Sequence, residues 1–373
     1  GVWLWDVSGK KYIDMMAAYS AVSHGHANPR ILKVLHDQSN KLNVSSRAYC
    51  NDQLGPFMEK LCQLSGMDRG LPMNTGAEAV ETAIKAARRW GYQHKGIPED
   101  KAEIIVAENN FHGRTTTIIS FSTSPKNREG FGPLTPGFIA VPYGDMEAMK
   151  AAITPNTAAV IIEPIQGEAG IIIPPKGYLK GIREICNKEN VLFILDEIQS
   201  GLGRTGKMFA FQHDNLKPDG LIVGKALGGG VLPVSAFLGK EELMMVFTPG
   251  CHGSTFGGNA LAAAVAHEAL TILEEENLSE RSAELGAYLL EELKKIDSPV
   301  VKSIRGQGLW IGIDVNTEII SANDLIKRLM EKGLLTKETH DLTIRVAPPL
   351  TITKEEIDYG VGIIKEVFGE VGG

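Results

Sequence analysis

The sequence lacks the features that mark secreted, membrane-spanning and nucleic-acid-binding proteins. It has only four cysteines among 373 residues and no C-x-x-C spacing, so neither a disulfide framework nor a cysteine zinc site is expected. No apolar run reaches the roughly 18 residues that a membrane span requires, and no secretory signal is recognisable. A net charge of −7 without a long basic run argues against a nucleic-acid partner. We therefore expect a cytoplasmic protein with reduced thiols.

The chain is long enough to bury more than one core. With 373 residues and 43% hydrophobic content it exceeds the usual size of a single core, so two domains are expected. It starts at Gly1 without a methionine and already in strand-like alternation, so we expect that an N-terminal segment precedes it. Repeats and long linkers are absent, and the domains should therefore pack closely.

The middle of the chain alternates between apolar runs and amphipathic stretches. The apolar runs indicate strands at residues 103–108, 158–163, 191–197, 221–223 and 234–238. Helical patterns lie among them at 77–92, 146–152 and 178–189. This alternation predicts an α/β fold with a large, mostly parallel sheet.

The last third of the chain has a different pattern. Long helices are indicated at 259–276 and 279–296, and then strands near Ile304 and at 309–315 and helices at 322–332 and 354–368. We expect residues 19–278 to form a large domain that binds the cofactor. Residues 1–18 and 279–373 should form a smaller α+β domain.

Lys225 has the clearest chemical implication. It follows the apolar run 221–223, and Asp196 lies at the end of another such run. Open α/β sheets bind their ligands at the carboxyl ends of parallel strands. A lysine near apolar groups is a nucleophile that forms Schiff bases, and an aspartate suits the ring nitrogen of pyridoxal phosphate. The alternative is an ordinary solvated lysine at a strand end.

Two other segments fit the phosphate of such a cofactor. Thr75, Gly76 and Ala77 begin an amphipathic helix, where free backbone N–H groups suit an anion. Ser254 and Thr255 provide hydroxyls ahead of the helix at 259–276. Ordinary helix capping is the alternative for both segments.

Two motifs favour other functions. The segment 201–207, GLGRTGK, satisfies G-x-G-x-x-G, the pattern of an NAD-dependent dehydrogenase, but it does not start at a strand end, and Met208 stands where a P-loop needs a hydroxyl. We expect instead a glycine-rich loop that covers the site. His24 and His26 have the spacing of a metal pair without a third ligand nearby, so we expect turn residues and no metal.

Arg114 and Arg345 are candidates for binding carboxylates. Each follows apolar or aromatic residues, and a structural ion pair is the equal alternative. Glu168 follows the strand at 158–163 and could neutralise one arginine when no substrate carboxylate is present.

The whole chain resembles the class III aminotransferases of fold type I. The shared motifs are NTG at 74–76, EPIQGE at 163–168, DEIQ at 196–199, GKAL at 224–227 and GSTFGG at 253–258. The resemblance implies that pyridoxal 5′-phosphate forms a Schiff base with Lys225, with Asp196 at its ring nitrogen. The other implied cofactor residues are Thr75, Gly76, Ala77, Phe111, His112, Gln199, Ser254 and Thr255. Thr255 would contact the cofactor of the other subunit in a homodimer.

Narrower motifs resemble the branch of this class that acts on ornithine. They are AYSAV at 18–22, LPMNTG at 71–76, GFGP at 130–133, and THD at 339–341 followed by IRVAPP at 344–349. They imply L-ornithine and 2-oxoglutarate as substrates. Arg114 would bind the α-carboxylate of ornithine, Tyr19 would shape the pocket, and Glu168 would mask Arg345 until 2-oxoglutarate enters. An acetylornithine or other ω-amino acid aminotransferase is the nearest alternative.

Overall fold

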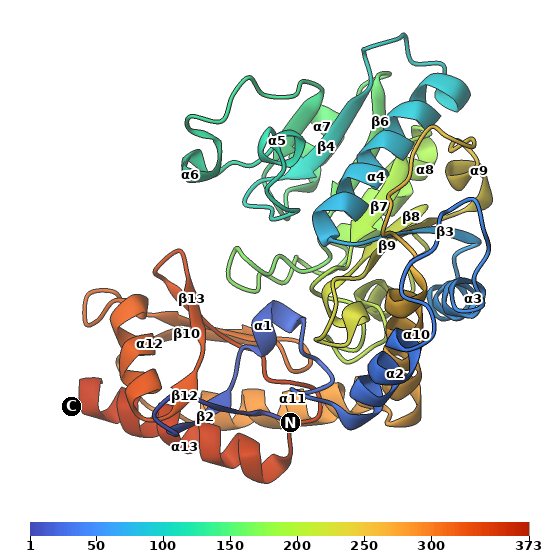
Figure 1. Cartoon of the computed structure of the whole chain (residues 1–373). Coiled ribbons are helices and arrows are strands. Elements are labelled where there is room, and N and C mark those ends of the chain that lie inside the picture. Colours follow the sequence, from blue (N-terminus) through green and yellow to red (C-terminus); the bar gives the residue numbers. More distant parts are fainter. Residues whose placement is uncertain (373) are drawn as a thin grey trace.

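A seven-stranded sheet forms the centre of the larger lobe. In this computed structural model, which describes residues 1–372, the strand order is β3-β9-β8-β7-β6-β4-β5 (Figure 1). The strands are β3 (Arg69–Met73), β4 (Glu103–Ala107), β5 (Phe138–Val141), β6 (Thr157–Ile162), β7 (Leu192–Asp196), β8 (Gly220–Val223) and β9 (Ser235–Gly239). Strands β4 to β8 are parallel, and only β9 runs against its neighbours β8 and β3. The predicted mostly parallel sheet is therefore confirmed.

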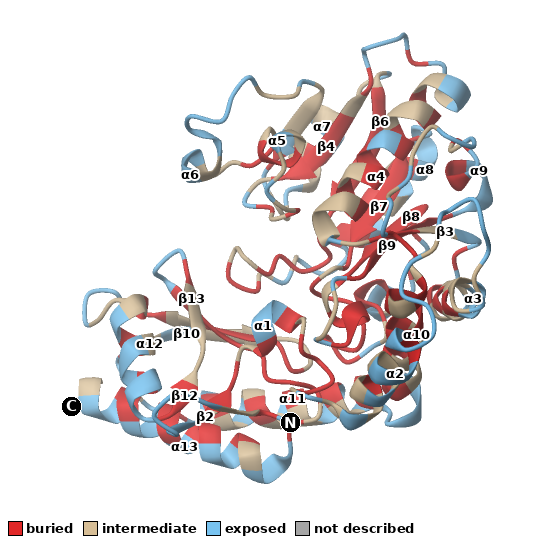
Figure 2. Ribbon diagram, in the orientation of Figure 1, coloured by how far each residue is buried: buried red, intermediate tan, exposed pale blue. Residues whose placement is uncertain are grey.

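The two edge strands, β3 and β5, were not predicted from the sequence. Strand β3 has the sequence RGLPM, in which glycine and proline weaken the strand signal, and β5 is short and half-exposed. Strands β6 to β9 are instead buried along their full length, as Figure 2 shows in red. Central strands with both faces covered have continuous apolar sequences that can be recognised, whereas edge strands lack this pattern.

Helices cover both faces of this sheet. Helix α4 (Gly76–Trp90) packs with alternate strand residues such as Ile161 and Ile194 on one face. Helices α7 (Met146–Ala152), α8 (Tyr178–Lys188) and α10 (Ala260–Glu275) pack on the other, where Val160 and Phe193 point. The remaining helical elements of this lobe are α2 (Pro29–Ser39), α3 (Leu54–Ser65), η1 (Gly91–Lys95), α5 (Thr116–Ile119), α6 (Pro125–Arg128), η2 (Ala210–Asp214), η3 (Lys225–Gly228) and α9 (Glu241–Met244).

The smaller lobe combines both ends of the chain. Its antiparallel sheet has the order β10-β11-β14-β13, formed by β10 (Val301–Gly306), β11 (Ile311–Val315), β14 (Thr343–Val346) and β13 (Lys337–Thr339). The helices α11 (Leu278–Lys294), α12 (Ala322–Glu331) and α13 (Lys354–Gly372) pack around it (Figure 1). A second sheet joins β1 (Trp3–Trp5) and β2 (Lys11–Asp14) to β12 (Leu334–Leu335). The expected division at residues 18 and 278 stays a prediction, which these pairings support; Gly373 lies outside the described residues.

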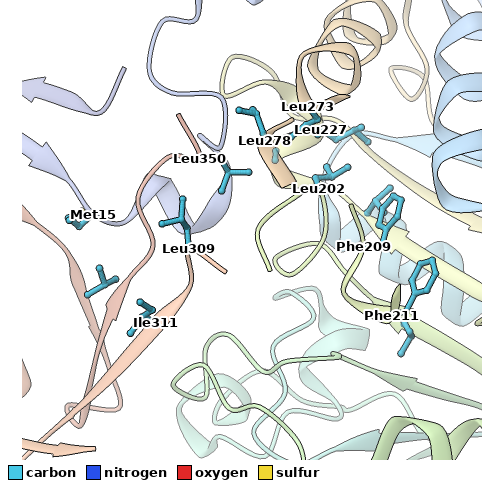
Figure 3. Packing of buried hydrophobic residues seen from close by; sticks show 14 of the residues in the cluster. Met15, Leu202, Phe209, Phe211, Leu227, Leu273, Leu278, Leu309, Ile311 and Leu350 are labelled. Carbon is cyan, nitrogen blue, oxygen red and sulfur yellow. The ribbon is translucent and has the colours of Figure 1, made fainter. Parts of the chain in front are cut away.

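A continuous apolar cluster joins the two lobes. Apolar side chains of both lobes meet at this junction (Figure 3). Leu202 and Leu273 come from the large lobe, Leu278 begins α11, and Leu309 and Leu350 come from the small lobe. All five side chains are almost fully buried. Burial of this extent opposes independent movement of the lobes, because separation would expose apolar surface to water. Within residues 1–372, no helix has the length and apolar character to cross a bilayer.

The glycine-rich segment 201–207 belongs to this junction. The guanidinium of Arg204 is fully buried and donates to the carbonyl oxygens of Leu309 and Pro348, at 2.9 and 2.6 Å, and to Ser23 Oγ at 3.1 Å. The Arg204 carbonyl accepts from Ser282 Oγ at 2.9 Å. The arginine of this segment is inserted between the lobes, and the expectation that the loop covers the site stays a prediction.

The short element α1 (Ala17–Ser20) has an unusual backbone. Its four residues have positive φ angles of 47°, 46°, 61° and 71°, so it is a turn of left-handed helix. Such a turn costs about 1–2 kcal/mol per residue for side chains with a Cβ. The carboxylate of Asp14 holds its beginning by accepting from the N–H groups of Met16 and Ala17 at 2.8 and 3.0 Å. Strain of this kind persists where the surroundings fix the backbone, often at functional sites.

Candidate active site

Lys225 and Asp196 lie at the same edge of the large sheet. Asp196 is the last residue of β7 and pairs in register with Ile222 of the parallel strand β8. Gly224 then separates β8 from Lys225, which begins the short helix η3. The carboxyl ends of the two strands thus bring the lysine and the aspartate to one side, as expected for parallel neighbours.

Lys225 is held in an unusual state. Its φ of 46° lies in the left-handed region, and its amine makes no hydrogen bond or ion pair within residues 1–372. Burial lowers the pKa of Lys225 to about 8, although the charges of Glu168, Asp196 and Glu163 oppose this effect. With such a pKa, about one tenth of the amine is in the neutral, nucleophilic form at pH 7, far more than in an ordinary lysine.

His112 fixes the carboxylate of Asp196. Its Nδ1 lies 2.6 Å from Asp196 Oδ2, and both side chains are buried. The other oxygen, Oδ1, accepts from the N–H of Ile198 at 3.0 Å. Burial alone would lower the pKa of His112, but the hydrogen bond and charge of Asp196 raise it. Nε2 of His112 is buried without a partner in the part of the chain described.

The N-terminus of α4 presents free N–H groups. Thr75 is its N-cap, and its side chain forms a reciprocal capping box with Glu78. The N–H groups of Gly76 and Ala77, which a helix cannot satisfy internally, find no acceptor among the described residues. A Cβ at Gly76 would lie 2.9 Å from Ile198, so the helix start packs closely beside the Asp196 segment. This end of α4 suits an anion.

The loop that carries Ser254 and Thr255 reaches this helix start. Ser254 Oγ accepts from Asn74 Nδ2 at 2.9 Å. Thr255 is exposed and lines a surface hollow of about 680 Å³ together with residues 44–47. Capping of α10 is performed by Asn259, which accepts from the N–H of Ala262, so neither hydroxyl is needed as a cap.

Arg345 is closed by a carboxylate. Its Nη1 donates to Glu168 Oε1 at 2.6 Å, and the same oxygen accepts from Gln199 Nε2 at 3.2 Å. The guanidinium carbon lies 5.0 Å from the centre of the Tyr19 ring. Thr339 donates its hydroxyl to the Glu168 carbonyl. These contacts join the left-handed turn α1, the small-lobe strand β14 and the loop after β6 in one cluster.

Arg114 is in a different situation. It is exposed, and its guanidinium carbon lies 5.7 Å from the centre of the Phe111 ring. It forms no salt bridge within residues 1–372. The two arginines that the sequence proposed for carboxylates therefore differ, since one is masked and the other is open.

One buried acid at this edge received no role from the sequence. Glu163 follows β6, is 5% exposed, and accepts from the N–H of Phe111 at 3.1 Å. Burial raises the pKa of Glu163 to about 7. Its position directly after a continuous apolar strand was visible, but the loop at 111–114 that it contacts could not be placed from the sequence.

The two histidines near the N-terminus have separate hydrogen-bond partners. Nε2 of His24 bonds the carbonyl of Ala269 at 2.9 Å, and Nε2 of His26 lies 2.7 Å from Asp14 Oδ2. No group of three or more metal-binding side chains occurs within residues 1–372. The interpretation of these histidines as turn residues agrees with their separate partners.

The comparison with known families decides the class. A family model described as "Aminotransferase class-III" matches residues 1–368. The chain belongs to this family. Class III aminotransferases depend on pyridoxal phosphate. A lysine, a buried aspartate and a helix N-terminus with free N–H groups are chemically suited to this cofactor.

Similar proteins and structures carry more specific names. The chain is 57% identical over 368 residues to an ornithine aminotransferase of Brevibacillus brevis, covering 99% of this chain and 92% of the relative. A crystal structure of the ornithine aminotransferase from Toxoplasma gondii matches with a TM-score of 0.98 at 45% identity, covering 100% of this chain and 89% of that one. A crystal structure of an acetylornithine aminotransferase from Elizabethkingia anophelis matches with a TM-score of 0.91 at 50% identity, covering 99% and 92%.

Proposed function

We propose that the protein transfers the δ-amino group of L-ornithine to 2-oxoglutarate. The products are glutamate 5-semialdehyde, which cyclises to pyrroline-5-carboxylate, and L-glutamate. The observation that carries this proposal is the contrast between an open Arg114 and an Arg345 closed by Glu168 at 2.6 Å. With one arginine masked, a single cationic site is available to the α-carboxylate of ornithine, and the δ-amine can then point toward Lys225.

The cofactor would be held by the groups described above. Asp196, oriented by His112, would keep the ring nitrogen protonated, and the N–H groups of Gly76 and Ala77 would bind the phosphate. Phe111 would pack on the ring and Gln199 would contact its hydroxyl. The bound cofactor supplies an electron sink for bonds at the amine-bearing carbon.

Lys225 would act as the base of the reaction. Its Nζ would take the proton from the δ-carbon of ornithine, because its pKa of about 8 leaves the amine partly neutral. Tyr19, whose ring lies beside Arg345, would limit the pocket around the substrate chain.

The second substrate requires a different charge pattern. The γ-carboxylate of 2-oxoglutarate would displace the Glu168 carboxylate and bind Arg345, which is suited to bidentate pairing. Its α-carboxylate would occupy the side of the pocket near the reacting carbon. One site would thus accept two unlike substrates in turn, because the movement of Glu168 leaves the positive charge of Arg345 free to bind a substrate carboxylate.

We further propose a homodimer in which Thr255 contacts the cofactor of the other subunit. Thr255 is exposed, and its neighbour Phe256 and the nearby Tyr49 are 56% and 73% exposed. Large apolar side chains at a hydroxyl-lined hollow are suited to a subunit contact.

The four cysteines, which form no disulfide among the described residues, support a reducing compartment such as the cytoplasm.

An acetylornithine aminotransferase is the second candidate, because the Elizabethkingia structure with that name is 50% identical to this chain. Both reactions use a δ-amine, so the discriminating experiment compares kcat/KM for L-ornithine and N-acetylornithine. We expect ornithine to be preferred, and a preference for N-acetylornithine would overturn the proposal. The half-reaction tests the chemistry separately: ornithine alone should bleach the bound cofactor's visible absorbance, and 2-oxoglutarate should restore it.

A further inference from the structure

Glu163 is a buried carboxylate that the proposed reaction has not used. It lies directly after β6, and its Oε2 accepts from the N–H of Phe111 at 3.1 Å. Its own carbonyl accepts from the hydroxyl of Tyr143 at 3.1 Å, which fixes the backbone at this point. Burial of a charged carboxylate costs free energy unless the carboxylate is paired and hydrogen-bonded, so its partners indicate what it does.

The titratable groups that face Glu163 are those of the cofactor site. Glu163 directly follows β6, which pairs in register with the neighbouring parallel strand β7, so Glu163 and Asp196 lie at the same sheet edge. The charges of His112 and Asp196 act on Glu163, and its own charge acts in turn on Lys225. Tyr143 also faces it and stays neutral, since burial raises the pKa of Tyr143 well above its ordinary value. Glu163 is therefore placed among a lysine, an imidazole and a second carboxylate that together set the protonation of the site.

We propose that Glu163 is a positioning residue of the cofactor site, which holds Phe111 through its backbone N–H and stabilises a proton on the Lys225 nitrogen through its negative charge. The inference rests on the proposed roles of Phe111 and Lys225. It separates two functions of one carboxylate: an oxygen that accepts a hydrogen bond, and a charge that acts over a longer distance.

The variant Glu163→Gln separates these functions, because the amide oxygen still accepts the N–H of Phe111 while the charge is lost. The visible absorbance of the holoenzyme is titrated between about pH 6 and about pH 10, and we expect the midpoint to fall by about one pH unit. The sign follows from the charge, since loss of a neighbouring anion makes the protonated nitrogen less stable. Circular dichroism of the bound cofactor should be unchanged in this variant.

Glu163→Leu removes both functions. The midpoint should fall as in the amide variant, and the dichroism of the bound cofactor should also weaken because Phe111 loses its anchor. Unchanged dichroism in the leucine variant would overturn the positioning of Phe111, and an unchanged midpoint in the glutamine variant would overturn the role of the charge.

Glu81→Gln is the matched control. Glu81 accepts the hydroxyl of Thr115 and so holds the same loop from α4, but its charge is not among those that act on Lys225. Its midpoint should equal that of the unmodified protein, and an equal shift would trace the effect to loop disturbance and overturn the inference. A colourless unmodified holoprotein would overturn the proposed function itself, and this outcome is distinct from a coloured protein whose midpoint does not move.

Discussion

The molecule buries two arginines in different ways, one at the lobe junction and one at the active site. Arg204 is surrounded by neutral acceptors, namely the carbonyl oxygens of Leu309 and Pro348 and the hydroxyl of Ser23. Arg345 is instead paired with the carboxylate of Glu168. Both side chains are 2% exposed or less.

The difference separates a permanent contact from an exchangeable one. Burial lowers the pKa of Arg204, and no carboxylate of residues 1–372 forms an ion pair with it. Two of its acceptors, the carbonyl oxygens of Leu309 and Pro348, belong to the small lobe, so these hydrogen bonds form only when both lobes are in place. The partner of Arg345 is a side chain that is 26% exposed, and we propose that another carboxylate replaces it. We therefore expect substitutions at Arg204 to change stability and substitutions around Arg345 to change substrate choice.

The largest effect is expected from Arg204→Met. Removal of the guanidinium leaves two buried carbonyl groups without donors, so the free energy of unfolding should fall by about 4 kcal/mol. Denaturant unfolding of the holoenzyme measures this loss. The relative kcat/KM for ornithine and N-acetylornithine should not change, and a changed ratio in a folded variant would remove the distinction between the two arginines.

The pH dependence of stability tests the surroundings of both regions, because each holds a buried glutamate. Glu163 lies at the active site, and Glu197 binds the N–H groups of Ala210 and Phe211 near the glycine-rich loop. Burial raises the pKa of each to about 7 from an ordinary 4.5. Below the ordinary pKa the carboxyl group is protonated in both the folded and the unfolded state, so its burial carries no penalty for a charge. As the pH rises from about 4.5 to about 7, each glutamate should remove about 3 kcal/mol of stability.

Unfolding free energies measured at intervals across this pH range test that slope. Because an amide does not titrate, Glu197→Gln should reduce the slope of unfolding free energy against pH by the contribution of Glu197. An unchanged slope would contradict the raised pKa of Glu197.

Arg345→Met should act on only one half of the reaction. Loss of a buried charged hydrogen-bond donor should lower kcat/KM for 2-oxoglutarate about 100-fold. The half-reaction with ornithine should change little, because Arg345 is masked at that stage. Single-turnover measurements of the two half-reactions provide the comparison, and an equal loss in both would show that Arg345 does not discriminate between them.

The smallest effect is expected from Glu168→Gln, which keeps the shape of the mask and removes its charge. L-glutamate should become a better amino donor, with kcat/KM raised about tenfold, because its γ-carboxylate no longer competes with an anion. Rates with glutamate and ornithine as alternative donors measure the change. If the use of glutamate is unaltered, the exchange of carboxylates at Arg345 is wrong.

The sequence predicted the parts of the site that lie on regular elements. Lys225 and Asp196 follow apolar strands, and parallel strands bring their carboxyl ends together, so their proximity follows from the fold class. The pairing of Glu168 with Arg345 joins the two lobes. From the residue types alone, we could predict only that Glu168 could neutralise one of the two arginines. The role of Arg204 was missed because its glycine-rich loop has no periodic pattern, and its partners are backbone carbonyls from distant segments.

The left-handed turn at Ala17–Ser20 also bears on the biosynthesis of the protein. Strand β2, just before this turn, pairs with β12, and the carbonyl of Met15 accepts the N–H of Ala347 at 2.7 Å. These partners lie roughly 320 residues later in the chain. At a synthesis rate of about 5–20 residues per second, the N-terminal segment waits roughly 15 to 60 seconds for these partners. The strained turn therefore acquires these neighbours only after the small-lobe strands have been made, so Tyr19, the residue proposed to shape the substrate pocket, is placed long after its own synthesis.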